Sequence, residues 1–453
     1  MLDYITLSLL SEIVEAAETS YRNNSKKIPI KGIKTDTRTL LPGEIFLALR
    51  GQNFDGHGFV DQAIKKDALA VITDQYIHVN TLAEVPQLIV KNTLESYQKI
   101  ASWWRQQLSI PVIGVTGSVG KTTTKELIAA VLSKQGKVLK TTANYNNEIG
   151  VPKTLLEIDS GHKFAVIEMG MRARGEIALL TQVCQPDIAV ITNVGTAHIG
   201  RLGSESAIAE AKCELLALMP RDSVAILNGD NPLLLKTAKK VWSGRTLTYG
   251  LESGDLRGII EGEDLVVDGM RFPLPLAGRH HASNYLAAIA VGKVLGLDLT
   301  FLESGIEVQL PDGRGQRHEV GPDVVLLDET YNAGLESMLA ALELLAHSGG
   351  KRRVAVLGTM KELGEHSAEL HRRVGRKVRE LGIDRLLVLV DDRSATQIAV
   401  GAANVETRCY STKEELIAAL RKTIAPGDRI LFKASHSVGL NEVVSAIHDE
   451  LNP

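Results

Sequence analysis

The sequence predicts an α/β protein of three domains, and two observations carry that prediction. The chain has 453 residues, which is long for one hydrophobic core. From Pro111 onward, apolar strands alternate with amphipathic helices, which is typical of parallel sheets covered on both faces. A Pro-, Gly- and Arg-rich stretch at residues 310–315 indicates a second linker. We expect a small α/β domain over residues 1–110, a central parallel-sheet domain over 111–311, and a doubly wound, Rossmann-like domain over 312–453.

Composition and charge are those of an ordinary soluble protein. Apolar residues make up 44% and charged residues 23% of the chain, and the net charge of −3 gives no electrostatic reason to expect nucleic acid as a partner. Cys184, Cys213 and Cys409 match no metal-binding spacing, which predicts reduced thiols. Residues Met1–Tyr4 and those after them lack the features of a signal peptide, and no apolar run approaches the roughly 20 residues of a membrane span. We therefore expect a cytoplasmic protein without membrane insertion.

In the first domain, short strands and helices alternate with Gly- and Asp-rich turns. A helical period runs from Leu9 to Ala17, and residues 44–49 have the pattern of a strand. This region contains no second phosphate-binding loop.

The later domains are expected to place polar residues along one edge of each sheet. Glu168 directly follows a predicted strand, as do the pairs Thr192-Asn193 and Asn228-Gly229. Open α/β sheets bind their ligands at the carboxyl ends of the strands, so we expect the site there. The predicted strands are 112–115, 164–167, 188–191 and 224–227 in the central domain, and 324–327, 354–357, 386–390 and 430–432 in the last.

A phosphate-binding loop follows the first central strand. Gly117 and Gly120 let backbone amides turn toward a polyphosphate, and the next helix directs its positive end to the same place. Lys121 would bring positive charge to the β- and γ-phosphates, and Thr122 a hydroxyl to Mg²⁺. Val115 stands where the general pattern has its first glycine, but the strand before the loop and the helix after it supply the required context. We predict nucleotide binding by Gly117, Ser118, Val119, Gly120, Lys121, Thr122 and Thr123.

Three residues further along are candidates for a metal-centred site. Glu168 could bind a hard cation, although a strand-terminal glutamate is as often a helix cap or a surface charge. His198 lies in a Gly-bearing loop after the next strand, where a histidine is commonly just solvated. Lys212 falls in the apolar stripe of a helix expected over residues 204–219, so it either extends to solvent or is buried for a reason.

Together these residues resemble the Mur ligases, the ATP-dependent amide ligases of peptidoglycan assembly. The resemblance covers essentially the whole chain, and the motifs follow the order that the family uses. Two stretches, residues 328–333 and 357–366, resemble the family member that adds D-alanyl-D-alanine. Beyond the phosphate loop, the resemblance includes Asn144, Asn146, Asn147, Glu168, His198, Lys212, Asn284, Arg314, Asp328, Tyr331 and Asn332.

The resemblance implies a reaction, its cofactors and its substrates. It implies that ATP and Mg²⁺ are used and that a carboxylate of UDP-N-acetylmuramoyl-tripeptide attacks the γ-phosphate to give an acyl phosphate. The amine of D-alanyl-D-alanine would then attack that carbonyl and expel phosphate. The central domain would bind ATP, and the last domain would close on it and bind the incoming dipeptide. The N-terminal domain would bind the UDP moiety.

The resemblance also implies a role for each matching residue. Lys121, Glu168, His198 and Lys212 are the implied catalytic residues. The implied metal ligands are Thr122, Glu168, His198 and Lys212, the last as a carbamate. With the phosphate loop, nucleotide contacts would come from Asn284, Arg314, Asp328, Tyr331 and Asn332. Contacts to the UDP-linked substrate would come from Asp36, Thr37, Arg38, Asp55, Gly56, His57, Asn144, Asn146 and Asn147.

The carbamate also has a physical basis. Burial can lower the pKa of a lysine by up to about 3–5 units, which leaves a neutral amine able to capture CO₂. The product is an anion with two oxygens that suit Mg²⁺.

Four residues depart from the family pattern, and two other functions stay open. Cys213 replaces a usual glycine, His281 an asparagine, Thr359 an aspartate and Gly334 a proline. The alternatives are another amide ligase of the superfamily, of the tripeptide-forming or folylpolyglutamate type, and a nucleotide-gated scaffold with an inactive site. The Asp-Asn-Pro signature that the tripeptide-forming ligase usually carries in its last domain does not occur in residues 312–453. We expect a monomer.

Overall fold

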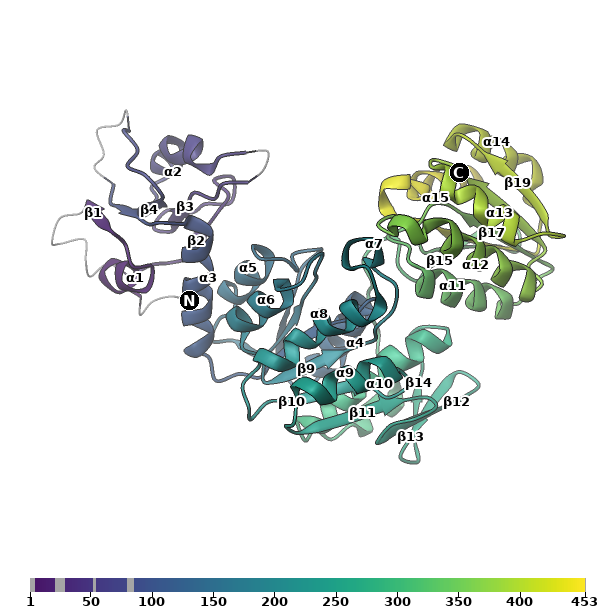
Figure 1. Cartoon of the computed structure of the whole chain (residues 1–453), viewed down its shortest axis with the longest axis horizontal. Helices are drawn as coiled ribbons and strands as arrows, with labels where there is room; N and C mark the ends of the chain where they lie inside the picture. Colours follow the sequence, from purple (N-terminus) through teal and green to yellow (C-terminus); the bar gives the residue numbers. More distant parts are fainter. Residues whose placement is uncertain (1–4, 21–28, 52–53, 80–84, 453) are drawn as a thin grey trace.

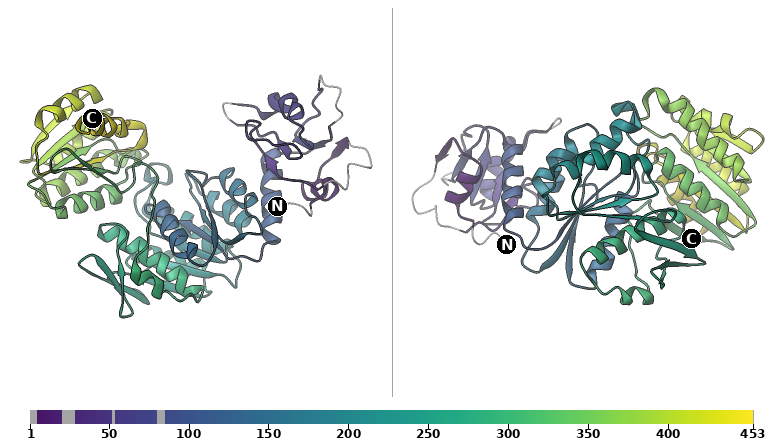
Figure 2. Two further views of the ribbon diagram at one scale, coloured as in Figure 1. Left: turned by 180° about the vertical axis from the view of Figure 1, so that it is seen from behind. Right: turned by 60° about the horizontal axis from the view of Figure 1, so that its bottom comes forward.

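The computed structural model describes residues 5–20, 29–51, 54–79 and 85–452. Three β-sheets with their helices form three bodies along the chain (Figure 1). The central body lies between the N-terminal and C-terminal bodies, which stand at opposite ends of the molecule in each view (Figures 1 and 2). The predicted three-domain α/β fold is confirmed. Residues Met1–Tyr4, which entered the signal-peptide prediction, lie outside the described residues.

The N-terminal domain contains a five-stranded sheet with the order β1-β5-β4-β3-β2. Strand β1 is antiparallel to β5, and the other neighbours are parallel. Helix α1 ends at Ile13, and Glu15 has a left-handed φ of +52°, so the helical period predicted as far as Ala17 is wrong beyond Ile13. The elements are α1 Leu7–Ile13, β1 Glu18–Ser20, β2 Ile33–Lys34, β3 Ile45–Leu47, η2 Gly56–Phe59, α2 Val60–Lys65, β4 Ala70–Thr73, β5 Gln87–Ile89 and α3 Thr93–Gln106.

The central domain contains a nine-stranded sheet with the order β14-β13-β12-β11-β10-β9-β6-β8-β7. The strands from β12 through β7 are parallel, as predicted, but β12, β13 and β14 form an antiparallel extension that the alternating pattern did not predict. The elements are β6 Val112–Thr116, α4 Lys121–Ser133, β7 Lys137–Lys140, α5 Gly150–Leu156, β8 His162–Glu168, α6 Glu176–Cys184, β9 Ile188–Ile191, α7 Ile199–Leu202, α8 Glu205–Leu218, β10 Val224–Asn228, α9 Pro232–Val241, β11 Thr246–Gly250, β12 Leu256–Glu261, β13 Asp264–Val267, β14 Met270–Pro273, α10 Arg279–Val294 and η3 Thr300–Ser304.

The C-terminal domain contains a six-stranded sheet with the order β15-β16-β20-β17-β18-β19. Strand β15 is antiparallel to β16, and the remaining pairs are parallel. The elements are β15 Gln316–Val320, β16 Val324–Asp328, α11 Leu335–His347, β17 Arg352–Leu357, η4 Gly364–His366, α12 Ser367–Glu380, β18 Arg385–Leu389, η5 Arg393–Ala395, α13 Thr396–Gly401, β19 Glu406–Tyr410, α14 Lys413–Thr423, β20 Asp428–Lys433, η6 His436–Val438 and α15 Leu440–Leu451.

Helix α3 joins the first two domains physically. Trp104 Nε1 donates a hydrogen bond to the carbonyl of Ile158 at 3.3 Å, and Arg105 forms an ion pair with Asp187 at 2.8 Å. Both partners belong to the central domain. The boundary at residue 110 therefore stays a prediction, because it assigns to the first domain a helix that is anchored on the second.

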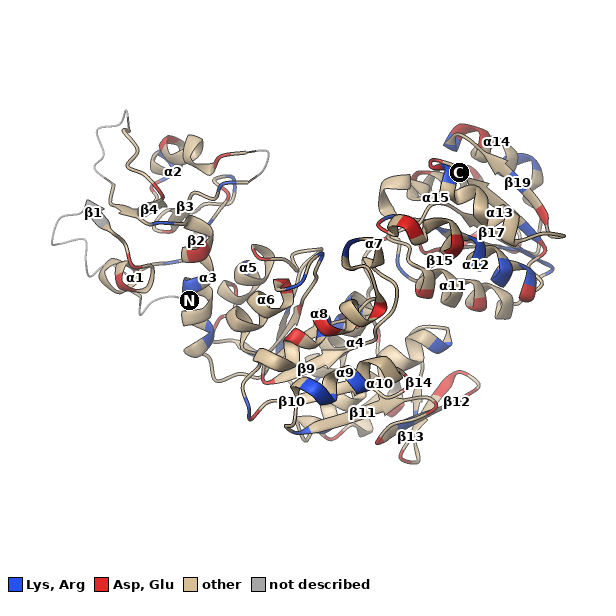
Figure 3. Ribbon diagram, viewed as in Figure 1, with Lys and Arg blue, Asp and Glu red and all other residues tan. Residues whose placement is uncertain are grey.

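Charged side chains are distributed over all three domains. Figure 3 shows Lys and Arg interspersed with Asp and Glu on each of them. In the part of the chain that the structure describes, no helix has the length and apolar character that a membrane crossing requires.

Candidate active site

The phosphate loop connects β6 to α4, and its glycines have conformations that other residues avoid. Gly117 has a φ of +155° and Gly120 a φ of +81°. A Cβ on Gly117 would stand 1.9 Å from the hydroxyl oxygen of Thr192. A Cβ on Gly120 would stand 2.7 Å from Asn284 Oδ1, so the structure brings Asn284, from α10, against the loop as the sequence predicts. Glycine is required at both positions for backbone and space alike.

The loop is braced from the carboxyl end of the neighbouring strand β9. Asn193 Oδ1 accepts a hydrogen bond from the amide of Val119 at 3.0 Å, and its main-chain carbonyl accepts one from the amide of Ser118 at 3.1 Å. The hydroxyl of Thr192 donates to the carbonyl of Val119 at 2.6 Å. We had not predicted a site role for Asn193, although its position after a central strand was a usable signal.

Lys121 is the first residue of α4, and its ammonium stays near the loop. Its Nζ donates to the carbonyl of Gly117 at 2.8 Å. Burial lowers the pKa of Lys121, the carboxylate of Glu168 opposes that shift, and the guanidinium of Arg314 adds to it. Glu168 and Arg314 therefore both lie close enough to Lys121 to act on its charge. Thr122, the next residue, is buried.

Glu168 ends β8 with a buried carboxylate that is 3% exposed. Its Oε1 accepts a hydrogen bond from Asn146 Nδ2 at 2.8 Å. Its Oε2 is buried without a hydrogen-bond partner among the described residues. Lys125 Nζ lies 3.8 Å from this oxygen and compensates its charge without a hydrogen bond. A buried carboxylate oxygen that accepts no hydrogen bond is costly, and a bound cation would offset that cost. The site therefore fits an oxygen-binding cation such as Mg²⁺, and the alternative that Glu168 is a surface charge is wrong.

Lys212 and His198 complete a group of basic side chains around Lys121. Lys212 is 1% exposed on α8, so the alternative that it extends to solvent is wrong. Burial, and then the positive charge of Lys121, lower the pKa of Lys212 well below its usual value. The same two causes lower the pKa of His198. The structure thus brings three predicted catalytic residues with basic side chains together beside the phosphate loop.

Two glutamates of the C-terminal domain contact the loop that carries His198. Glu362 Oε2 lies 2.6 Å from His198 Nδ1, and Glu362 Oε1 accepts from Arg201 at 3.1 Å. Glu336 Oε1 accepts a hydrogen bond from the main-chain amide of Thr196 at 2.7 Å. Sequence reasoning missed both glutamates, because their partners lie more than a hundred residues away along the chain.

The C-terminal domain also brings its predicted nucleotide residues to one place. The guanidinium of Arg314 stacks on the ring of Tyr331, 3.8 Å from its centroid. The buried Lys433, which we had not predicted, donates from Nζ to the carbonyl of Asn332 at 3.0 Å. Burial lowers the pKa of Lys433, and the carboxylate of Glu329 opposes the shift.

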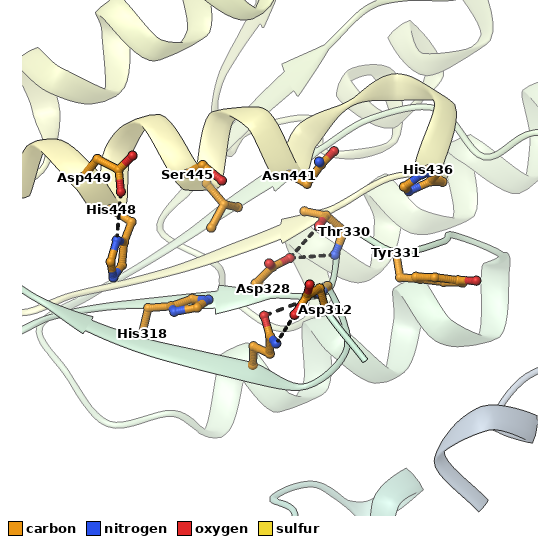
Figure 4. A pocket seen from close by; sticks show the side chains of 13 residues that line it. Asp312, His318, Asp328, Thr330, Tyr331, His436, Asn441, Ser445, His448 and Asp449 are labelled. Atoms are coloured by element: carbon orange, nitrogen blue, oxygen red, sulfur yellow. Dashed lines mark hydrogen bonds and ion pairs between the residues drawn. The ribbon is translucent and has the colours of Figure 1, made fainter. Parts of the chain in front are cut away.

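A cavity of about 310 Å³ lies beside Tyr331, between the edge of the sheet and α15 (Figure 4). Asp328 stands in its wall, and its Oδ1 accepts from the amide and the hydroxyl of Thr330 at 2.9 and 2.6 Å. The cavity is lined by Asp312, Gly313, Gln316, His318, Asp328, Thr330, Tyr331, His436, Asn441, Val444, Ser445, His448 and Asp449.

The residues predicted to contact the UDP-linked substrate divide into exposed and internal groups. Arg38 is exposed and pairs with Asp36 at 2.7 Å. Arg38 lowers the pKa of Asp36, with a smaller contribution from Lys153 of the central domain. Tyr145, in the segment between Asn144 and Asn147, contributes to the raised pKa of Arg38. Arg38 therefore lies near this segment. Asn144 and Asn147 of the same segment are exposed, and Asn147 Oδ1 accepts from the amide of Gly150 at 2.9 Å.

The other residues predicted to contact this substrate make contacts within the protein that stabilise its own loops. His57 Nδ1 contacts Asp55 at 2.6 Å, and its Nε2 accepts from the amide of Asp74 at 3.1 Å. A Cβ on Gly56 would meet the backbone of Leu49, at 2.7 Å from its carbonyl oxygen. Likewise, the hydroxyl of Thr37 donates a hydrogen bond to Gln62 Oε1 at 2.7 Å. Asn146 Nδ2 donates one to Glu168 Oε1. For these residues, substrate contact stays a prediction.

The fold and the site together indicate a three-domain α/β protein whose nucleotide-binding centre is of the ATP-dependent ligase type. Family models match three consecutive parts of the chain: "Mur ligase family, catalytic domain" residues 29–110, "Mur ligase middle domain" residues 115–292, and "Mur ligase, glutamate ligase domain" residues 313–436. The chain belongs to the Mur ligase family.

Individual relatives match over nearly the full length. A UDP-N-acetylmuramoyl-tripeptide–D-alanyl-D-alanine ligase of Synechocystis is 59% identical over 99% of this chain and 98% of the relative. The ligase of that name from Bacillus subtilis is 37% identical over 92% of each chain. Among solved structures, MurF from Acinetobacter baumannii has a TM-score of 0.85 at 30% identity and covers 97% of this chain and 98% of its own. MurF from Thermotoga maritima in complex with ADP has a TM-score of 0.82 at 30% identity, with 93% and 98% covered.

Proposed function

We propose that this chain joins D-alanyl-D-alanine to UDP-N-acetylmuramoyl-tripeptide with the conversion of ATP to ADP and phosphate. The observation that carries the proposal is the cluster of the buried Glu168 and Lys212 with the half-buried Lys121 and His198 beside the phosphate loop. Relatives named for this reaction, with identities of up to 59%, support the choice of substrates.

The residues divide the reaction into two steps. In the first, the carboxylate of the tripeptide attacks the γ-phosphorus of ATP and ADP leaves, which forms an acyl phosphate. Lys121 and the loop amides stabilise the charge that develops on the phosphate oxygens. In the second, the amine of the dipeptide attacks the acyl carbon, loses a proton and displaces phosphate. Arg314, stacked on Tyr331, brings a further positive charge from the C-terminal domain.

The metal site would be formed by Thr122, Glu168, His198 and Lys212. The support for it is Glu168 Oε2, which is buried and accepts no hydrogen bond from the described residues. When bound, Mg²⁺ would neutralise negative charge on the phosphates. Asn146 orients the carboxylate by a hydrogen bond to its other oxygen, Oε1.

We further propose that Lys212 carries a carbamate in the active enzyme. Its burial and the nearby charge of Lys121 favour the neutral amine, and the carbamate anion would match the cations around it. Lys212→Ala should lose ligation while retaining nucleotide binding, and a small carboxylate in the buffer should restore part of the activity. Full activity in rigorously CO₂-free buffer after long equilibration would contradict the carbamate.

The remaining predictions complete the proposal. The exposed Asp36 and Arg38, with Asn144 and Asn147, would contact the UDP-linked substrate, and the cavity beside Asp328 would receive part of the nucleotide. The C-terminal domain would close on ATP and bind the dipeptide. Domain boundaries at residues 110 and 311, a monomeric state and a cytoplasmic location are part of the same proposal.

The direct test is phosphate release by the purified protein. We expect release from ATP only when UDP-tripeptide and D-alanyl-D-alanine are both present, and assays with diaminopimelate- and lysine-containing tripeptides identify the third residue. Release that needs a free amino acid instead of the dipeptide would favour another amide ligase of the superfamily. Nucleotide binding without any substrate-dependent release would favour the inactive scaffold.

A further inference from the structure

Helix α4 carries a fully buried lysine that the reaction scheme does not use. Lys125 is 1% exposed, and its Nζ donates a hydrogen bond to the carbonyl of Thr141 at 2.8 Å. The same Nζ lies 3.1 Å from Glu126 Oε1 and 3.8 Å from Glu168 Oε2. A buried ammonium is costly unless it is paired, so these contacts indicate what Lys125 does.

Lys125 is one member of a line of four alternating charges. Lys140, at the end of β7, pairs with the second carboxylate oxygen of Glu126, Glu126 pairs with Lys125, and Lys125 approaches Glu168. The line begins at the surface, where Lys140 is 44% exposed, and ends at Glu168 Oε2, which accepts no hydrogen bond from the described residues. The four side chains carry two positive and two negative charges. The negative charge of the buried Glu168 carboxylate is therefore compensated within the line.

Lys125 also ties together the elements that carry two proposed metal ligands. Thr122 lies three residues earlier on α4, and Glu168 ends β8. Thr141 closes the connection between them, because its carbonyl accepts from Lys125 and its hydroxyl oxygen accepts from the amide of Glu168 at 2.9 Å. The lysine therefore holds the helix of the phosphate loop against the end of the strand.

We propose that Lys125 is a positioning residue for the metal site. It holds the helix that carries Thr122 against the strand that ends at Glu168. Its ammonium compensates the charge of Glu168 Oε2 from 3.8 Å without a hydrogen bond to that oxygen. It acts through Glu168 and does not touch substrate. The inference rests on the proposed function, in which Glu168 binds Mg²⁺.

The test measures metal binding directly. Lys125→Met keeps the length of the side chain and removes its charge, whereas Lys125→Arg keeps the charge. Mn²⁺ replaces Mg²⁺, and electron paramagnetic resonance counts free Mn²⁺ in the presence of enzyme and ADP. We expect Lys125→Met to weaken Mn²⁺ binding by about 10- to 100-fold, the range for residues that orient a metal ligand. Binding of fluorescent ADP without a divalent ion should be unchanged, and Lys125→Arg should recover part of the Mn²⁺ binding.

The matched control is Lys137→Met. Lys137 is also an ion-paired lysine, on β7, but it is 57% exposed and pairs with Asp159. If Lys125→Met does not fold, as judged by circular dichroism, its combination with Glu126→Gln removes both charges of the buried pair and takes its place. Normal Mn²⁺ binding by a folded Lys125 variant, or an equal loss of ADP binding without a divalent ion, would overturn the positioning role.

Glu168→Gln separates this inference from the proposed function. If Glu168→Gln itself binds Mn²⁺ normally, the metal role of Glu168 fails. If Glu168→Gln weakens Mn²⁺ binding and the Lys125 variant does not, only the positioning role of Lys125 fails.

Discussion

Lys121, His198 and Lys212 share one electrostatic situation. Burial lowers the pKa of each of them, and Lys121 lowers the pKa of the other two further. These shifts favour the neutral forms of His198 and Lys212, so the site does not hold three positive charges at one place. A polyphosphate that binds at the loop would stabilise the charged form of Lys121.

At the residue scale, Lys121→Ala should reduce ligation about a thousandfold, or roughly 4 kcal/mol of transition-state stabilisation. The reason is the loss of a positive charge at the end of the loop, where negative charge develops on the γ-phosphate. Steady-state phosphate release measures the effect, and Lys134→Ala, at the opposite end of α4, is the matched control. Near-normal turnover by a folded Lys121→Ala protein would remove the phosphate-loop assignment.

The sequence predicted single residues well where their signal was local. The phosphate loop depends on spacing within eight residues, and the structure places its glycines and Asn284 in contact. Burial could not be predicted for Glu168 or Lys212, because it depends on the neighbouring strands and helices that cover them. Lys125 escaped notice because its partners Thr141 and Glu168 are distant along the chain.

At the scale of elements, the contact of α7 with the segment before η4 connects two domains. His198 and Glu362 face each other there, and both have left-handed backbones, with φ of +68° and +64°. Such a conformation costs roughly 1–2 kcal/mol for a residue with a side chain. The amide of Gly200 donates to the carbonyl of Glu362 at 3.1 Å. Main-chain and side-chain interactions therefore both stabilise this contact between the domains.

Glu362→Gln should lower kcat by about tenfold or more, the effect typical of a group that orients a metal-binding histidine. The charged partner of His198 and Arg201 is lost, whereas the phosphate loop is untouched, so the KM for ATP should change little. Glu365→Gln, on η4 and exposed, is the control. An unchanged kcat would show that the contact between the two domains has no part in the reaction.

Elements with continuous apolar runs were predicted to within a few residues, whereas mixed ones were missed. Strands β6, β8, β9 and β10 are buried on both faces, which explains their readable sequences. Strand β7 is at most half-buried, and its two apolar residues between lysines are too few to form an apolar run or an alternating pattern. The antiparallel strands β12, β13 and β14 follow no helix, so the βαβ pattern did not include them.

At the scale of the whole molecule, the site draws on more than one domain. The central domain supplies the phosphate loop and Glu168, and the C-terminal domain supplies Arg314, Glu336 and Glu362. The N-terminal domain supplies Arg38, and Tyr145 of the central domain acts on its charge. Binding of the two large substrates is therefore expected to be separable.

Arg38→Ala should raise the KM for the UDP-tripeptide and leave the KM for ATP nearly unchanged. Arg38 is exposed on the N-terminal domain, whereas the phosphate loop lies in the central domain. Initial rates with each substrate varied in turn measure both constants, and Lys65→Ala, exposed on α2, serves as the control. An equal loss for both substrates would contradict this division between domains.

The central claim is that the tripeptide carboxylate attacks the γ-phosphate of ATP before the dipeptide amine attacks the carbonyl. Oxygen-18 in that carboxylate tests the claim most directly, because the acyl phosphate retains the bridging oxygen and phosphate carries it away. The account predicts one ¹⁸O atom in each phosphate released during ligation, detected by mass spectrometry. Phosphate that takes its fourth oxygen from water and contains no ¹⁸O would contradict it.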